Sequence, residues 1–473
     1  MPLILGTNSI KDTGYNVANS LRFDDGSSDN IQRTYGTPTN AKIFGLSWWV
    51  KLGKAFDGSG SQDFWGERAD GSNRVFHAIN ADGTFNYFEK NGGSTVLNLQ
   101  TNRLFRDNSS WYHFLLLGDS TQGTASNRIK LYVNGVQETS FSTETYPSLD
   151  YQFRLAINTT KYFGRIGLGG SLSTNYYDGY LAEAVFVDGT VTAHTDYGEF
   201  DEDSPTIWKP KDVSGLTFGN NGFYLDFENA SSLGADVSGN SNNFTVNNLT
   251  SIDQSTDTCT NNFATYNNLL PTIPPTFSEG NTKITQSGNS WDIAYSTIGV
   301  SSGKWYMEVK WESGSQMNPG FASSSVFELN PSFTRGTNNP SNGGAIYTMY
   351  TDGSIYKNNS ASSYGSGISS GNIQMLAMDL DNNKFYWGQN GTFQNSADPA
   401  NNSNGFAIDS SHQGNTWHFH ISVYGSGDKL GNFGNPAFSI SSGNSDANGF
   451  GNFEYAVPSG FFALCTKNLA ESG

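Results

Sequence analysis

The sequence has little cysteine, little positive charge and no long apolar run. Its two cysteines, Cys259 and Cys465, are too far apart to suggest a metal site or a disulfide framework. Lys and Arg total 26 against 43 Asp and Glu, which gives a formal net charge of −17. Such a chain has no basic stripe for a phosphate backbone, and no segment approaches the roughly 18 apolar residues of a membrane span. We therefore expect neither a nucleic-acid partner nor membrane insertion.

What the sequence does have is glycine and aromatic residues in short alternating runs. It contains 54 Gly, and aromatics make up 14% of the chain. Glycine weakens helices, whereas aromatics supply large areas to bury. No long segment has the 3.6-residue apolar period of a helix, and alternating runs separated by turn residues indicate strands. These patterns predict an all-β fold of two β-sandwich domains with almost no helix.

The second half of the chain is organised around the alternating stretch GKWYMEVKW at 303–311. Because side chains on a strand alternate between its faces, this stretch predicts a strand with one buried and one solvated face. Together with MDLDNNKFYWGQNGTF (378–393), GNFGNP (431–436) and FEYAVPSGFFALCTKNL (453–469), it resembles a SPRY-type β-sandwich. The resemblance implies a SPRY-like domain at 276–473.

Five motifs of the first half occur in the order in which a second type of β-sandwich fold has them. They are SLRFDDGSSDNI (20–31), FGLSWWVKL (44–52), SSWYHFLLLGDS (109–120), RIKLYVNGVQ (128–137) and DGYLAEAVFVDG (178–189). This set resembles the laminin-G-like, concanavalin A-like jelly roll and implies such a domain at 1–200. Members of that family often bind glycans or proteins, and some bind calcium. The resemblance therefore implies a structural Ca²⁺ site built from Asp24, Asp25 and Asp178, and no other cofactor is expected.

Residues 201–275 are expected to connect the two domains with short strands. They are either a strand pair added to the first domain or a small bridging subdomain. The stretches 197–271 and 431–469 also resemble bacteriophage virion proteins. The first residues lack the charged and apolar regions of a signal peptide, which suits a protein that is assembled in the host cytoplasm and released in a virion.

The candidate catalytic and metal-binding residues are carboxylates and histidines, and neither type forms a complete catalytic or ligand set. A glycosidase needs two carboxylates flanking the sugar. The nearest pattern, EFDED at 199–203, lies in linker-like sequence and indicates a solvated connector. Glu183 has no spaced partner and is expected to orient a loop. His418 and His420 share one strand face, a spacing that can bind metal, but no third ligand is near in sequence. We therefore predict no catalytic residues.

Candidate sugar-binding residues are tyrosines beside polar loops, which we expect to be exposed. Sugar faces stack on aromatic rings, and Asn or Asp side chains bind the hydroxyls. The long Gly/Ser/Asn-rich segments 312–346 and 394–416 are the expected binding loops of the second sandwich. The candidates are Tyr176, Tyr177, Asp178, Tyr347, Tyr350 and Tyr364.

Together these patterns predict a non-enzymatic bacteriophage virion protein, of the tail-fibre or appendage kind, that attaches to host-surface glycan. Its expected partners are other virion proteins and further copies of itself, with a trimer favoured. The alternatives are a polysaccharide-degrading depolymerase and a ligand-free capsid or tail decoration protein. A cellular SPRY adaptor is more distant, because the sequence has no Cys/His cluster for a partner domain.

Overall fold

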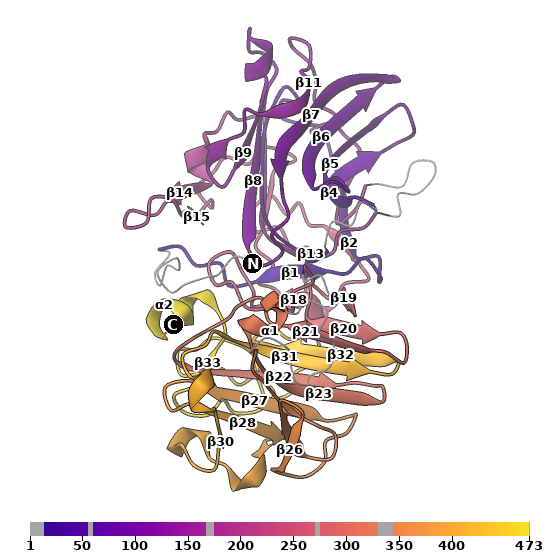
Figure 1. The fold of residues 1–473 in the computed structure, drawn as a ribbon. Coiled ribbons are helices and arrows are strands. Elements are labelled where there is room, and N and C mark those ends of the chain that lie inside the picture. Colours follow the sequence, from indigo (N-terminus) through magenta and orange to yellow (C-terminus); the bar gives the residue numbers. More distant parts are fainter. Residues whose placement is uncertain (1–13, 55–59, 167–174, 270–274, 330–343, 473) are drawn as a thin grey trace. The chain divides into compact units, whose positions relative to one another are not determined.

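The computed structural model describes residues 14–54, 60–166, 175–269, 275–329 and 344–472. The first residues of the chain, which lack a signal-peptide pattern, lie outside this range. The predicted all-β fold class is confirmed, with 43% strand and 7% helix. The chain divides into two units, Thr13–Thr260 and Asn261–Gly473 (Figure 1). Among the described residues, no helix is long and apolar enough to cross a membrane.

The first unit contains two eight-stranded antiparallel sheets with a shared core. One sheet has the order β10 (Val136–Gln137), β9 (Ile129–Val133), β8 (Trp111–Asp119), β3 (Ile43–Leu52), β13 (Gly179–Asp188), β1 (Ser20–Phe23) and β18 (Gln254–Ser255), with β16 (Phe223–Leu225) paired to β13. The other has the order β11 (Phe141–Thr145), β7 (Ser94–Leu104), β6 (Thr84–Asn91), β5 (Arg74–Ile79), β4 (Gln62–Arg68), β12 (Thr160–Phe163), β2 (Asn30–Thr34) and β17 (Thr245–Asn247). A hairpin of β14 (Gly198–Phe200) and β15 (Trp208–Pro210) completes the unit.

The turns of this unit follow the local sequence. Asn134 and Gly135 both have positive φ, 47° and 76°, between the paired strands β9 and β10. A two-residue turn of this kind matches the twist of its strands and favours Asn-Gly. Between the sheets, Trp48 is fully buried and stacks on His77 and Phe114 with centroids 5.6 and 5.7 Å away. The aromatic content of the sequence thus forms the core.

Residues 201–260 of the predicted connector 201–275 belong to the first unit. β16 pairs with β13, β17 with β2, and β18 with β1. Phe223 and Phe244 pack edge to face in the unit's core, with centroids 4.8 Å apart. The physical reason is burial, because these aromatics complete a core that earlier strands leave open. Of the two alternatives, the structure fits strands added to the first domain.

The second unit contains a nine-stranded and a six-stranded sheet. The larger has the order β19 (Thr276–Ser278), β20 (Lys283–Gln286), β32 (Gly427–Asn432), β22 (Lys304–Trp311), β27 (Ile373–Asp379), β28 (Lys384–Gln389) and β29 (Thr392–Phe393), with β30 (Phe406–Ala407) on β28 and β33 (Phe462–Ala463) on β22. The smaller has the order β21 (Trp291–Tyr295), β31 (Trp417–Tyr424), β23 (Gln316–Ser323), β24 (Ile346–Met349), β25 (Ser354–Lys357) and β26 (Ser360–Ser363). The α-helices among the described residues of this unit are α1 (Ser324–Leu329) and α2 (Thr466–Ser472).

The central strand β22 is buried on both faces, which corrects the expectation of one solvated face. Trp305, Met307 and Val309 enter the core between the sheets. On the other face, Tyr306 is also fully buried, in a cluster that includes Phe453 and Phe461. The cause is the C-terminal segment, which covers this face and adds the parallel strand β33.

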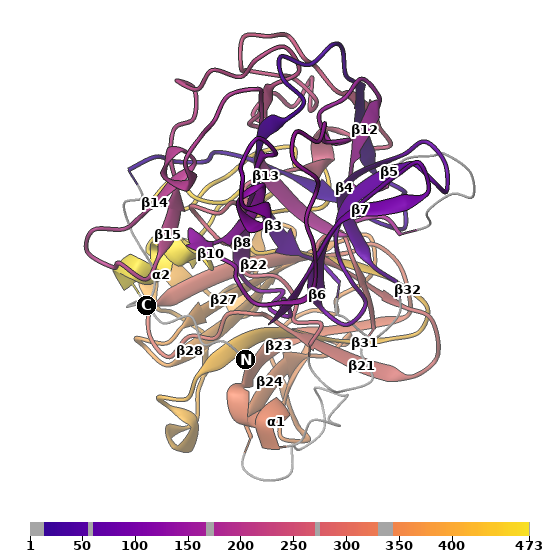
Figure 2. The same ribbon diagram turned by 90° about the horizontal axis from the view of Figure 1, so that it is seen from above.

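The segment 312–346 is not one long loop, because its first part forms β23 and α1. Val326 and Phe327 of α1 pack with Ile293, Tyr295 and Ile346 on the face of the six-stranded sheet that points away from the core. Figure 2 shows α1 beside β24. Residues 330–343 of this segment lie outside the described residues. The first residue of the helix, Ser324, lies next to the start of β31, where its N–H donates to the Thr416 carbonyl.

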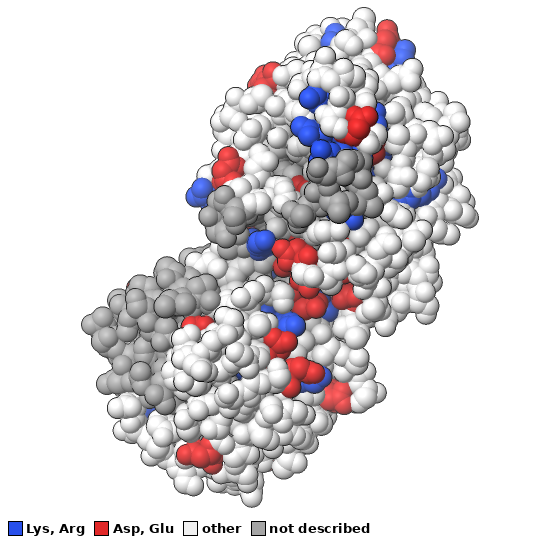
Figure 3. All heavy atoms as spheres, turned by 90° about the vertical axis from the view of Figure 1, so that its right-hand side faces the viewer, with Lys and Arg blue, Asp and Glu red and all other residues white. Residues whose placement is uncertain are grey.

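Charged side chains are sparse on the face drawn in Figure 3. Basic and acidic residues occur singly or in mixed groups between large uncharged areas. No basic stripe crosses this face. The view agrees with the charge composition of the sequence.

Candidate functional site

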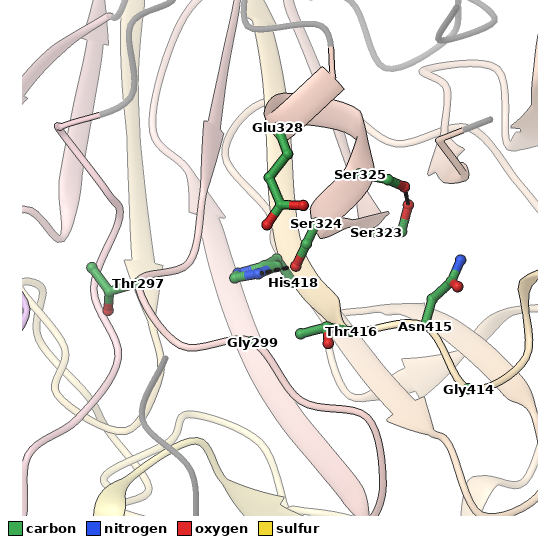
Figure 4. Close-up of a pocket in the computed structure, with 10 residues that line it drawn as sticks. All are labelled: Thr297, Gly299, Ser323, Ser324, Ser325, Glu328, Gly414, Asn415, Thr416 and His418. Atoms are coloured by element: carbon green, nitrogen blue, oxygen red, sulfur yellow. Dashed lines mark hydrogen bonds between the residues drawn. The ribbon is translucent and has the colours of Figure 1, made fainter. Parts of the chain in front are cut away.

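A polar pocket of about 430 Å³ lies in the second unit (Figure 4). Three chain segments enclose it: the turn after β21, the junction of β23 with α1, and the turn leading into β31. The described lining residues are Thr297, Gly299, Ser323, Ser324, Ser325, Glu328, Gly414, Asn415, Thr416 and His418. Two of these segments belong to 312–346 and 394–416, or directly follow them, so the predicted binding loops do meet at a cavity.

Strand pairing brings these segments together. β23 and β31 are antiparallel, with Ser323 opposite Trp417. One residue further, the Ser324 N–H donates to the Thr416 carbonyl at 2.9 Å, and Val300 forms a bridge with Trp417. Because each turn begins where a paired strand ends, the backbone fixes the pocket walls.

His418 is held in one tautomer by its neighbours. Its Nδ1 lies 2.9 Å from the Ser296 carbonyl oxygen, which can only accept, so Nδ1 carries the proton. Its Nε2 lies 3.1 Å from Ser324 Oγ and accepts the hydroxyl hydrogen. Burial lowers the pKa of His418 to about 4, so the ring is neutral at physiological pH. A Cβ on Gly299 would come within 2.4 Å of Nε2, and glycine is therefore required there.

The three consecutive serines have different roles. Ser323 is buried, its Oγ accepts the Ala345 N–H at 2.9 Å, and it lies 2.7 Å from Ser325 Oγ. A buried hydroxyl needs an acceptor for its hydrogen, so Ser323 donates to Ser325. The hydrogen of Ser325 is then available to the pocket, whereas Ser324 gives its hydrogen to His418 and offers only lone pairs.

The metal interpretation of His418 and His420 gains no support from the structure. His418 uses both ring nitrogens within the protein, and His420 is fully buried. Among the described residues, three ligand atoms come together only at Asp24, Asp25 and Asp178, within 4.8 Å of one another.

The three aspartates predicted for calcium do meet in the first unit. Asp24 and Asp25 follow β1, and Asp178 directly precedes β13, which pairs with β1. Carboxylate oxygens are hard ligands of the kind that Ca²⁺ prefers, so the donor set fits this ion. Asp178 is buried, and Lys54 Nζ lies 3.0 Å from Asp25 Oδ2. The lysine partly neutralises the cluster, and a bound cation would compete with it.

Three of the candidate tyrosines are buried, which corrects the expectation that they are exposed. Tyr177 donates to the carbonyls of Lys51 and Tyr180 in the first core. Tyr347 and Tyr364 are buried in the core of the second unit, where their rings contact Phe406. A position beside a polar loop in the sequence does not reveal whether a ring packs inward, and these three rings face the cores of their units.

The other two tyrosines are half-buried, and each already contacts other side chains of the protein. Tyr176 accepts from Arg165, whose guanidinium also lies 4.8 Å above the tyrosine ring. Tyr350 donates to Gln316, and its ring packs at 5.4 Å from Tyr356. Neither lines the polar pocket described above.

The acidic run 199–203 lies in the first strand and the turn of the β14–β15 hairpin. Asp201 accepts the N–H groups of Asp203 and Ser204, and Lys209 lies 3.3 Å from it. Lys209 also lies 3.6 Å from Glu199. These carboxylates thus hold a turn.

Glu183 is buried at an irregularity of β13, with φ of 49°. It accepts from Tyr224 at 2.7 Å and from Tyr15 at 3.3 Å. Burial raises the pKa of Glu183 to about 8. Its contacts tie the segment before β1 to β16, a role that spacing along the sequence could not reveal.

A second cavity, of about 340 Å³, was missed from the sequence. It lies in the first unit, where Tyr132 and His194 stack in parallel with centroids 4.8 Å apart. Asp119, Asn127 and Lys130 contribute to its polar lining. Tyr132 alternates outward on β9, and this alternation was the only available signal.

Comparison with known proteins identifies no family for the chain. No protein-family model and no curated protein matches it. Among solved structures, a heptameric SAP-like pentraxin from Limulus polyphemus is 14% identical with a TM-score of 0.27, covering 38% of this chain and 81% of the pentraxin. The SPRY domain of human HERC1 is 14% identical with a TM-score of 0.24, covering 32% and 85%. A candidate carbohydrate-binding protein from Bacteroides ovatus is 16% identical with a TM-score of 0.35, covering 49% and 59%.

Proposed function

We propose that this chain is a non-enzymatic bacteriophage virion protein, in a fibre or appendage, that attaches the particle to glycan on the host surface. Further copies of the chain, as a homotrimer, and other virion proteins are its partners. The sequence resemblance at 197–271 and 431–469 supports the virion assignment. The attachment role is supported by one structural observation, the hydroxyl-lined pocket between α1 and the turn before β31.

The pocket suits a glycan because its polar groups lie at or next to the ends of paired strands, where strand pairing fixes the backbone. Small-molecule sites usually have a volume of about 300–1,000 Å³ and a few fixed polar groups. This pocket is about 430 Å³ and has serine, threonine and asparagine side chains at its wall. Hydroxyl and amide groups can donate to and accept from sugar hydroxyls.

We further propose that Asp24, Asp25 and Asp178 hold a structural Ca²⁺ in the first unit. The closeness of their oxygens and the chemistry of carboxylates support this site. Bound calcium would fix the loop after β1 against the start of β13. The site would therefore stabilise the first sandwich without taking part in a reaction.

Binding to host cells tests the attachment role. The purified, fluorescently labelled chain is incubated with cells that the parent phage infects, before and after periodate oxidation of their glycans. Saturable binding that periodate removes is the expected result. Binding that survives periodate would point to a protein receptor. An absence of binding to every such host would refute the attachment role and favour a decoration protein.

The depolymerase alternative differs from the attachment role in the product that it predicts. A depolymerase releases reducing ends from host polysaccharide, whereas a binding protein releases none. Incubation of the purified chain with host polysaccharide, followed by an assay of reducing sugar, distinguishes the two. We expect no release.

A further inference from the structure

We propose that the pocket between α1 and the turn before β31 takes a neutral or amino-bearing sugar and discriminates against sugars that carry a carboxylate. Glu328 sets this preference. The proposal rests on the proposed attachment to glycan and specifies the class of sugar.

The charge of the lining residues provides the first argument. Glu328 projects from α1 toward the pocket in Figure 4. None of the ten described lining residues is Lys or Arg. His418 is neutral, because its Nδ1 proton is bonded to the Ser296 carbonyl and its Nε2 accepts from Ser324. An anionic sugar would meet one like charge and no described cation, whereas an amino sugar would meet an opposite charge.

The hydrogen-bonding groups provide the second argument. Ser325 has a free hydroxyl hydrogen, since its oxygen already accepts from Ser323. Thr416 and Asn415 add a hydroxyl and an amide from the turn leading into β31. Ser324 offers lone pairs, because its hydrogen points to His418. The pocket therefore presents both donors and acceptors, as the hydroxyls of a neutral sugar require.

The composition of the lining also sets the affinity of the pocket for such a sugar. No Phe, Tyr or Trp is among the ten described lining residues, so these rings make no stacking contribution there. Glu328 is exposed, and solvent therefore weakens its field. We expect a single site to bind with a Kd on the order of 1 mM. Several copies on one particle would compensate through avidity.

Matched monosaccharides test the assignment. Glucose, glucosamine and glucuronate share one ring and differ in charge, and the galactose series repeats the comparison with another stereochemistry. Ligand-observed NMR titration of the full chain is expected to show binding of the neutral or amino sugar in at least one series. The corresponding uronate should bind about ten-fold more weakly, and added salt should reduce this difference.

Two variants and one control locate the effect. Glu328→Gln should remove most of the discrimination between neutral and anionic sugar. Ser325→Ala should weaken both sugars to a similar extent. Glu312→Gln, which changes an exposed carboxylate of the same unit that does not line the pocket, should leave both unchanged. Circular dichroism confirms that each variant is folded.

Equal or tighter binding of the uronate would overturn the proposal, as would unchanged binding in both pocket variants. Failure of the proposed attachment function is recognised by a separate measurement, the binding of the labelled chain to host cells. If the chain binds cells in a periodate-sensitive manner and neutral sugars do not compete, attachment stands and the pocket assignment is wrong. If the chain binds neither cells nor sugars, both proposals are wrong.

Discussion

The carboxylate of Glu308 is the best single test of how the second unit is held together. It lies on the face of β22 that the C-terminal segment covers, and it is fully buried. Its oxygens accept the N–H groups of Glu454 at 2.9 Å and Tyr455 at 2.8 Å. They also accept from Tyr306 at 3.0 Å and Asn432 at 3.2 Å. Burial raises the pKa of Glu308 to about 7, despite these donors.

Removal of this carboxylate should destabilise the second unit by several kcal/mol. In Glu308→Ala, two part-buried backbone N–H groups and the buried donors of Tyr306 and Asn432 lose their acceptor. An unsatisfied buried donor costs about 1–3 kcal/mol, so we expect a loss of about 3–5 kcal/mol after partial rearrangement. In Glu308→Gln, an amide replaces one oxygen and opposes at least one backbone N–H. That variant should lose about 1–3 kcal/mol.

The assay is thermal unfolding of the full chain, with hydrogen exchange at the Tyr455 amide as a local probe. A loss of 1 kcal/mol lowers the Tm of a domain this size by about 2–4 °C, so Glu308→Ala should lower it by roughly 6–20 °C. Glu312→Gln is the control, because that side chain is 46% exposed and its ion pair is worth little. If Glu308→Ala shifts the Tm no more than this control, the reasoning is refuted.

Three further results are expected. Burial raises the pKa of Glu183 to about 8 and that of Glu89 to about 7, so the folded state binds more protons than the unfolded state above the usual value of 4.5. The contribution of these groups to stability is therefore fully present below that value and is lost progressively until the pH passes about 8; urea midpoints should fall between pH 5 and 8 and then level off, with a smaller fall in Glu183→Gln. Calcium at roughly a hundred times its Kd should stabilise the first unit by about 3 kcal/mol. Asp25→Asn should abolish this gain, whereas the exposed control Asp150→Asn should keep it. An equal gain in both variants would exclude the site. Tyr347→Phe removes an acceptor of the Asp409 N–H and should cost about 1–2 kcal/mol in urea unfolding without changing glycan binding, whereas lost binding would return this ring to the site.

Local patterns of the sequence predicted the central strand of the second unit. The stretch at 303–311 is β22 without its first residue. Alternation succeeded here because a strand's period does not depend on what packs against it. It failed to predict which faces are buried. Tyr306 and Tyr347 occupy strand positions at which an exposed side chain was expected. Later segments of the chain cover Tyr306, and Tyr347 packs in the core of the second unit.

The pocket shows the same limit. The Gly/Ser/Asn-rich segments were identified as binding loops, and residues from them line the cavity. The sequence could not predict that Ser324 would reach His418, which lies 94 residues further along the chain. Only the register of β23 with β31 places these two side chains together. The three aspartates of the first unit were found because a family resemblance supplied the long-range pairing that spacing lacks.

The pairing of first and last segments has a consequence for the order of folding. In the first unit β18 pairs with β1, and in the second the Ala264 N–H donates to the Leu464 carbonyl. Each unit therefore depends on contacts that span almost its whole length, and such high contact order slows folding. During synthesis, the first unit cannot close until residue 255 has left the ribosome, nor the second until residue 464. Each emerging sandwich exposes open strand edges in that interval, which makes chaperone binding during translation advantageous.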